Sequence, residues 1–236
     1  MAEVRHVQLE SGTAVTAIVY AAAAPAMATL VLAHGAGANQ LSPFMVEFAG
    51  ALAARQLDVV TFNFPFTERG KKLPDPQPVL EACYRTVLAQ VATDPVLGGR
   101  PLFIGGKSLG GRMASHVAAA RDAADSDAVT WWDRLRGLVL LGYPLHPPGK
   151  PQQLRVSHLA RIAHPMLFVQ GSRDAFGTPP ELRVFLDVLA ARSTLHVVEG
   201  GDHSFAVPKR SGIQPEEILR SNASAVAEWV ASHAIA

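Results

Sequence analysis

The chain has 236 residues, of which 49% are hydrophobic and 17% are charged. This composition is typical of a compact globular protein and excludes a disordered chain. The net charge of +1 at pH 7 gives no excess of basic residues, so we expect no nucleic acid partner. An α/β chain of this length is routinely one domain, and we expect residues 1–236 to form a single domain.

Ala14 to Ala33 lacks charged residues and is the one stretch long enough to suggest a membrane span. Pro25 interrupts this stretch and the residues on either side are typical of strands, so we expect two strands and no membrane partner. No short apolar run follows a basic N-terminus, and a secretory signal is not expected. A cytoplasmic location is the default expectation. The one cysteine, Cys83, is expected to be a small buried apolar residue.

The N-terminal half of the chain predicts strands that alternate with helices. In chain order we expect a hairpin of Val4–Leu9 and Thr13–Tyr20, a strand at Thr29–Ala33, a helix at Pro43–Arg55, a strand at Leu57–Phe62, a loop at Asn63–Pro78 and a helix at Val79–Thr93. The loop is predicted from its four prolines. In the helix predicted at Val79–Thr93, the helical spacing places Val79, Cys83, Val87 and Val91 on one face.

The C-terminal half continues the same alternation. We expect strands at Pro101–Gly105, Gly137–Gly142, Met166–Gln170 and Thr194–Val198, helices at Gly110–Ala120, Glu181–Ala191 and Pro215–His233, a surface connection at Arg121–Asp127 and a proline-rich loop at Tyr143–Lys150. The predicted fold class is therefore α/β, with a mostly parallel central sheet that begins antiparallel and carries helices on both faces. In such sheets, the active crevice forms at the carboxyl ends of the strands.

Gly106-Lys107-Ser108-Leu109-Gly110 has the form G-x-S-x-G and lies between a predicted strand and a predicted helix. In this setting the serine occupies a strained turn that exposes its hydroxyl, and the glycines leave room for neighbouring backbone. We interpret Ser108 as a nucleophile. A phosphate-binding P-loop is excluded, because that pattern requires glycine where Pro101 stands.

A serine nucleophile requires a base and a third group that orients the base. His203 follows the last predicted strand and Asp174 follows the strand before it. The order Ser108, Asp174, His203 is that of α/β-hydrolases. We predict that His203 is the general base and then the acid, and that Asp174 fixes the imidazole tautomer. Asp202 competes for the orienting role, although its place next to His203 makes a direct approach to the ring less favourable.

The loop after the strand Thr29–Ala33 is rich in glycine and is either an oxyanion-binding loop or a plain turn. In the first case, the backbone N–H groups of Ala36 and Leu109 hold the oxyanion. Four further residues are candidates for substrate binding: His34, Lys107, Arg112 and His146. Lys107 and Arg112 either pair with nearby polar groups or, if they face the pocket, favour an anionic substrate.

Five segments in order resemble one group of proteins: residues 33–38, 105–112, 142–150, 171–177 and 201–205. They are similar to the α/β-hydrolase group of testis-expressed protein 30 and the nonspecific-lethal complex subunit 3, and more distantly to dienelactone hydrolases. The resemblance covers nearly the whole chain and implies an α/β-hydrolase fold with a Ser108, Asp174, His203 triad. It implies no substrate, and it includes a member that acts as a component of a protein assembly.

The leading hypothesis is a serine hydrolase that cleaves a small carboxylic ester or thioester through an acyl-enzyme. The alternative is a non-catalytic hydrolase-like scaffold that binds a protein partner. Perhydrolase or haloperoxidase-like chemistry on the same three residues is a third possibility. The Tyr143–Lys150 loop is too short for a helical lid, and an open site suits small or surface-presented esters. No metal or cofactor motif is present, so none is proposed.

Overall fold

The computed structural model describes residues 2–120 and 131–234. It contains one eight-stranded sheet with the strand order β1-β2-β4-β3-β5-β6-β7-β8. The strands are β1 (Ala2–Gln8), β2 (Ala14–Tyr20), β3 (Ala28–Ala33), β4 (Leu57–Phe62), β5 (Leu102–Lys107), β6 (Leu135–Leu141), β7 (Met166–Gly171) and β8 (Ser193–Val198). The pairs β1–β2 and β2–β4 are antiparallel and the other pairs are parallel, as predicted.

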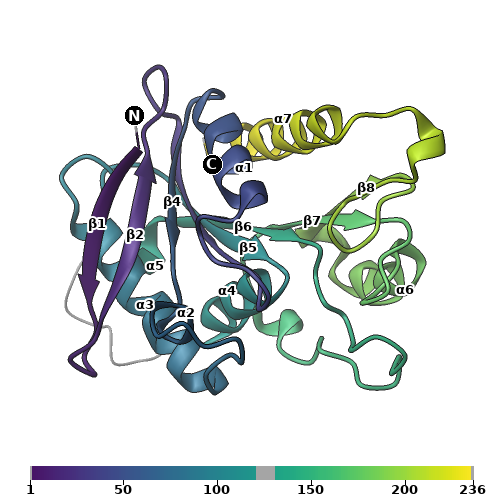
Figure 1. The fold of residues 1–236 in the computed structure, drawn as a ribbon, viewed down its shortest axis with the longest axis horizontal. Coiled ribbons are helices and arrows are strands. Elements are labelled where there is room, and N and C mark those ends of the chain that lie inside the picture. The colour runs from purple at the N-terminus through teal and green to yellow at the C-terminus, as the bar shows by residue number, and fades with distance from the viewer. Residues whose placement is uncertain (1, 121–130, 235–236) are drawn as a thin grey trace.

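Helices cover both faces of the sheet (Figure 1). They are α1 (Pro43–Ala53), α2 (Pro65–Glu68), α3 (Gln77–Thr93), α4 (Leu109–Ala119), α5 (Trp131–Arg134), α6 (Pro179–Leu186) and α7 (Pro215–Ala234), with short 3₁₀ turns at Leu159–Arg161, Asp187–Arg192 and Lys209–Ser211. One core cluster joins the sheet to α1 and α7, and the other joins it to α3, α4 and α6. The predicted fold class is therefore confirmed.

Two predictions for the N-terminal half need correction. The segment Asn63–Pro78 is not all loop, because Pro65 begins the short helix α2 and Pro78 lies in the first turn of α3. Proline fixes a helical φ and loses no hydrogen bond at the start of a helix, so these prolines begin helices instead of excluding them. Val79 is 43% exposed and does not share the buried face of α3.

Other differences lie further along the chain. The helix predicted at Glu181–Ala191 is α-helical only to Leu186 and continues as a 3₁₀ turn. The four-residue helix α5 was not predicted, and the connection predicted at Arg121–Asp127 lies outside the described residues. Cys83 is buried as predicted, and burial raises the pKa of its thiol to about 12. No helix in residues 2–120 and 131–234 has both the length and the apolar character needed to cross a membrane.

Candidate active site

Ser108 lies at the sharp turn between β5 and α4. Its backbone has φ 51° and ψ −112°, a region that L-residues rarely adopt. The Ser108 N–H donates to the Leu141 carbonyl oxygen at 2.9 Å, which ties the turn to the neighbouring strand β6. A strained residue of this kind persists only where the surrounding structure holds it in place. The strained turn predicted from the G-x-S-x-G pattern is present in the fold.

The two flanking glycines are required by close approach of the β3 strand end. A Cβ atom on Gly106 would lie 2.3 Å from the Ala33 carbonyl oxygen, and one on Gly110 would lie 2.1 Å from the same atom. No side chain fits at these distances without a shift of backbone. The glycines therefore let β5 and α4 pack against β3 and bring Ser108 next to the loop that follows Ala33.

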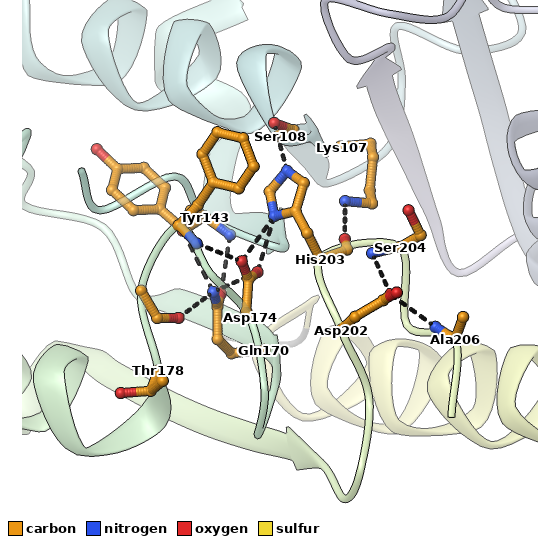
Figure 2. Close-up of polar contacts among 12 residues, drawn as sticks. Lys107, Ser108, Tyr143, Gln170, Asp174, Thr178, Asp202, His203, Ser204 and Ala206 are labelled. Atoms are coloured by element: carbon orange, nitrogen blue, oxygen red, sulfur yellow. Dashed lines mark hydrogen bonds and ion pairs between the residues drawn. The ribbon is translucent and has the colours of Figure 1, made fainter. Parts of the chain in front are cut away.

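A chain of hydrogen bonds connects Ser108, His203 and Asp174 (Figure 2). Ser108 Oγ lies 2.8 Å from His203 Nε2, and His203 Nδ1 lies 2.8 Å from Asp174 Oδ2 and 3.0 Å from Asp174 Oδ1. The three residues come from the ends of β5, β7 and β8, which are parallel neighbours or near neighbours in the sheet. The structure thus brings together the three residues predicted to be catalytic.

Asp174 is 1% exposed and is surrounded by donors. Its Oδ2 accepts a hydrogen bond from Gln170 Nε2 at 2.8 Å, and its Oδ1 accepts one from the Phe176 N–H at 2.8 Å. Gln170 was not predicted as a site residue. Its sequence signal is weak, since it is a single polar residue at the end of the apolar strand Met166–Gln170.

Asp202 does not contact the imidazole in this arrangement. Its Oδ1 accepts hydrogen bonds from the Ser204 N–H at 2.7 Å and the Ala206 N–H at 3.0 Å, so the carboxylate stabilises the loop that carries His203 (Figure 2). Phe176 stacks on the His203 ring with centroids 4.1 Å apart. Of the two carboxylates considered for the orienting role, Asp174 has the suitable geometry.

Ser108 and His203 line a cavity of about 600 Å³. The glycine-rich loop after β3 forms one wall, and both Ala36 and Leu109 are lining residues. In the described part of the chain, no backbone carbonyl accepts a hydrogen bond from the Ala36 N–H, and Leu109 is the first residue of α4, where an N–H has no partner within the helix. These N–H groups remain candidates for binding an oxyanion.

Two of the four residues considered for substrate binding do not line the cavity. His34 is fully buried; its Nδ1 lies 2.8 Å from the Gly35 carbonyl oxygen and its Nε2 accepts from the Phe64 N–H at 3.2 Å. Burial lowers the pKa of His34. His146 Nδ1 lies 2.9 Å from the Pro147 carbonyl oxygen and its Nε2 lies 3.4 Å from Glu181. The prediction that these two side chains bind substrate therefore needs correction. Neither residue lines the cavity, and both side chains hydrogen-bond to backbone groups instead.

The other two, Lys107 and Arg112, line the cavity. Lys107 Nζ donates to the His203 carbonyl oxygen at 2.5 Å, and Arg112 Nη2 donates to Gln77 Oε1 at 3.0 Å. Burial lowers the pKa of Lys107 to about 8, while Asp174 and Asp202 partly oppose this shift. The sequence left two alternatives for these residues, pairing with nearby polar groups or facing the pocket. In the structure, each residue does both.

The described residues contain no group of three or more His, Cys, Asp and Glu side chains placed to hold a metal ion.

Comparison with known proteins gives a consistent result. A family model described as an alpha/beta hydrolase domain matches residues 26–231. Among solved structures, the chain is similar to a dienelactone hydrolase from Anabaena variabilis, with a TM-score of 0.73 and 18% identity over 99% of this chain and 98% of that one.

It is also similar to a member of the α/β serine hydrolases without a lid from Xanthomonas campestris, with a TM-score of 0.71 and 18% identity over 100% of this chain and 96% of that one. The esterase domain of a Rhodothermus marinus protein matches with a TM-score of 0.73 and 10% identity over 99% of both chains. At such low identity, these structures show the fold alone. Because the family model matches most of its residues, the chain belongs to the alpha/beta hydrolase domain family.

Proposed function

We propose that this protein is a serine hydrolase that cleaves a small carboxylic ester or thioester through an acyl-enzyme intermediate. The observation that carries the proposal is the hydrogen-bonded chain from Ser108 Oγ through His203 to Asp174, with both shortest contacts at 2.8 Å. Serine becomes nucleophilic when a base accepts its proton, and a buried carboxylate fixes the base in the required tautomer. Asp174 meets this requirement because it is 1% exposed.

In the first half of the proposed reaction, Ser108 Oγ attacks the carbonyl carbon of the ester while His203 Nε2 accepts the hydroxyl proton. The backbone N–H groups of Ala36 and Leu109 stabilise the oxyanion of the tetrahedral intermediate. The intermediate then collapses: the bond to the leaving group breaks, His203 returns the proton to the departing alcohol or thiol, and the acyl group remains on Ser108.

In the second half, His203 accepts a proton from water, and the resulting hydroxide attacks the acyl carbon. Collapse of the second intermediate breaks the bond to Ser108 Oγ, which regains its proton from His203, and the carboxylic acid is released. A cavity of about 600 Å³ suits a small ester. The five sequence segments support, as a further part of the proposal, membership of the testis-expressed protein 30 group.

The direct test is labelling of the purified protein with a fluorophosphonate probe, followed by assays with 4-nitrophenyl esters. We expect the wild type to be labelled and the Ser108→Ala and His203→Ala variants to remain unlabelled. Asp174→Asn is expected to lower kcat by on the order of 10³- to 10⁴-fold, because the amide favours the wrong imidazole tautomer.

Asp202→Asn is the matched control. It makes the same change in the residue next to His203, and an asparagine oxygen still accepts the hydrogen bonds from the N–H groups of Ser204 and Ala206. Its kcat should stay within about threefold of the wild type, because the hydrogen bonds that hold the His203 loop are kept. Absence of probe labelling and of ester hydrolysis in the wild type would contradict the proposal and favour a binding scaffold.

A further inference from the structure

Apart from His203, the titratable residues that line the cavity all carry a positive charge. Lys107, Arg112 and Arg155 line it, and no aspartate or glutamate is among its described lining residues. Arg155 was not singled out from the sequence. A cavity wall of one charge sign raises the local concentration of ligands with the opposite charge.

The two arginines approach the cavity from different segments. Arg112 lies in the first turn of α4, four residues after Ser108, so it stands one helical turn beyond the nucleophile. Arg155 follows the proline-rich loop, and its backbone is fixed there: its N–H donates to the Leu145 carbonyl oxygen at 2.8 Å and its carbonyl oxygen accepts from the Tyr143 hydroxyl at 2.7 Å.

Neither guanidinium is neutralised by a carboxylate in the described part of the chain. Arg112 Nη2 donates to the Gln77 amide, its Nε is buried without a hydrogen-bond partner, and the same Gln77 side chain donates to Glu81 at 2.7 Å. The amide therefore separates Arg112 from the nearest acidic group of this network. The Arg155 guanidinium has no hydrogen bond or ion pair with any described residue.

The two positive charges also affect each other. Burial and the nearby Arg112 charge lower the pKa of the Arg155 guanidinium. Lys107 is not equivalent to them, because its ammonium group is engaged by the His203 carbonyl oxygen at 2.5 Å. Two unneutralised guanidiniums in one cavity wall are unfavourable in the free protein, and an anion between them removes the repulsion.

We infer that Arg112 and Arg155 bind an anionic oxygen group of the substrate, a carboxylate or a phosphate, so that the substrate is an ester with a second, negatively charged group. This inference rests on the proposed function and specifies its substrate class. Guanidinium groups bind such oxygens through paired, charge-assisted hydrogen bonds. The bound anion would orient the ester at Ser108 from the α4 side of the cavity.

The test compares 4-nitrophenyl hydrogen succinate with 4-nitrophenyl butyrate, whose acyl chains are similar in length and differ in the terminal carboxylate. We expect the wild type to prefer the hemisuccinate in kcat/KM by at least about tenfold. Arg155→Gln and Arg112→Gln should each reduce this preference by about 10- to 100-fold, mainly through KM.

Arg161→Gln is the control. Arg161 is exposed, its charge acts on the same neighbouring histidines as that of Arg112, and it does not line the cavity. It should leave the preference within about threefold of the wild type, which separates direct binding from the general effect of net charge. Equal kcat/KM for the two esters in the wild type, or an unchanged preference in both cavity variants, would overturn the inference.

The source of the anion is tested by inhibition of butyrate hydrolysis with succinate and with inorganic phosphate. The anion that inhibits more strongly identifies whether the site prefers a carboxylate or a phosphate, and Arg155→Gln should weaken that inhibition. Thermal shift of the Ser108→Ala variant with the same two anions requires no activity. Stabilisation there, absent in Ser108→Ala/Arg155→Gln, would support the anion site even if the hydrolase proposal failed; no stabilisation together with no inhibition would refute it.

Discussion

Gln170 is fully buried and uses both ends of its amide next to Asp174. Its Nε2 donates to Asp174 Oδ2 at 2.8 Å and to the Gly177 carbonyl oxygen at 2.7 Å, while its Oε1 accepts from the Tyr143 N–H at 2.8 Å (Figure 2). One side chain thus joins the loops that follow β6 and β7 and fixes the carboxylate between them. It is a positioning residue, because it acts on His203 only through Asp174.

Replacing Gln170 by leucine should therefore reduce kcat more than it changes KM. Leucine has a similar size but leaves Asp174 without one donor, and we expect kcat to fall by about 10- to 100-fold from the misplaced triad. The loss of stability should be about 1 to 3 kcal/mol, because buried polar partners lose their hydrogen bonds.

Thr29→Val is a control that separates the two effects. Thr29 is equally buried and donates to the Leu97 carbonyl oxygen at 3.0 Å, far from the cavity lining. It should lower the melting temperature with kcat retained. Equal losses of kcat in both variants, measured at a temperature where both are folded, would argue against a positioning role for Gln170.

At the scale of single residues, the sequence predicts which side chains can carry the chemistry better than it predicts where those side chains point. Ser108, Asp174 and His203 follow strands in the expected order, and parallel strands place their ends at one edge of the sheet. His34 also follows a strand, yet its ring turns inward to the backbone of Phe64. Which way a side chain points depends on packing partners distant in sequence, and for the same reason Arg155 was missed.

The contact between α4 and β3 determines where the nucleophile lies. Gly110 leaves no space for a Cβ atom, since that atom would lie 2.1 Å from the Ala33 carbonyl oxygen and 2.5 Å from the Ala33 carbonyl carbon. Both are backbone atoms of a central strand, so relief of the clash requires α4 to move away from the sheet. Because Ser108 is directly attached to α4, this movement would also displace its hydroxyl from His203.

We therefore expect Gly110→Ala to destabilise the protein by about 1 to 3 kcal/mol or more, as overpacked cores do, and to lower probe labelling of Ser108. The comparison is Gly50→Ala in α1, where a Cβ atom meets nothing within 4 Å. Alanine is the better helix former, and this change should stabilise by about 0.5 to 1 kcal/mol. Urea unfolding of the two variants measures both effects; similar free energies of unfolding would show that the close approach is unimportant.

Elements with a strong apolar pattern were predictable, whereas those that depend on context were not. The strands β3 to β7 are almost entirely buried, and the predicted ends of all eight strands lie within two residues of the observed ends. The short helices α2 and α5 have four residues each, too few to show a helical period. The face of α3 is set by contact with α4 and the sheet, which moves Val79 to the surface.

The candidate site lies at one end of the parallel sheet, and a hydrophobic core cluster packs against each face of the sheet. Figure 1 shows α1 and α7 together on one side of the sheet and α3 and α4 on the other. His158 lies on the side of the sheet that carries α3 and α4. There it is surrounded by α4, the proline-rich loop and the 3₁₀ turn at Leu159–Arg161. Its Nε2 lies 2.8 Å from Ser115 Oγ and 3.5 Å from the Tyr143 hydroxyl, and its ring stacks on His116 at 3.7 Å.

This junction should make the whole fold sensitive to acid. Burial, together with the charges of His116, Arg112 and Arg161, lowers the pKa of His158 to about 3. Between this value and the ordinary histidine pKa of about 6.5, the unfolded chain binds a proton at this site that the folded chain does not. The free energy of unfolding therefore rises with pH in this window and falls on acidification, by up to about 2 kcal/mol between pH 7 and pH 5.

His158→Gln removes the titrating group and keeps a side chain that can hydrogen-bond Ser115. The variant is expected to be less stable than the wild type at pH 7, because the stack on His116 is lost, but its melting temperature should fall less between pH 7 and pH 5. The pH slope, measured by circular dichroism, is the informative quantity. A matched change at exposed His6, His6→Gln, should leave the wild-type slope unchanged; parallel slopes for the wild type and His158→Gln would mean that His158 accepts its proton in the folded state.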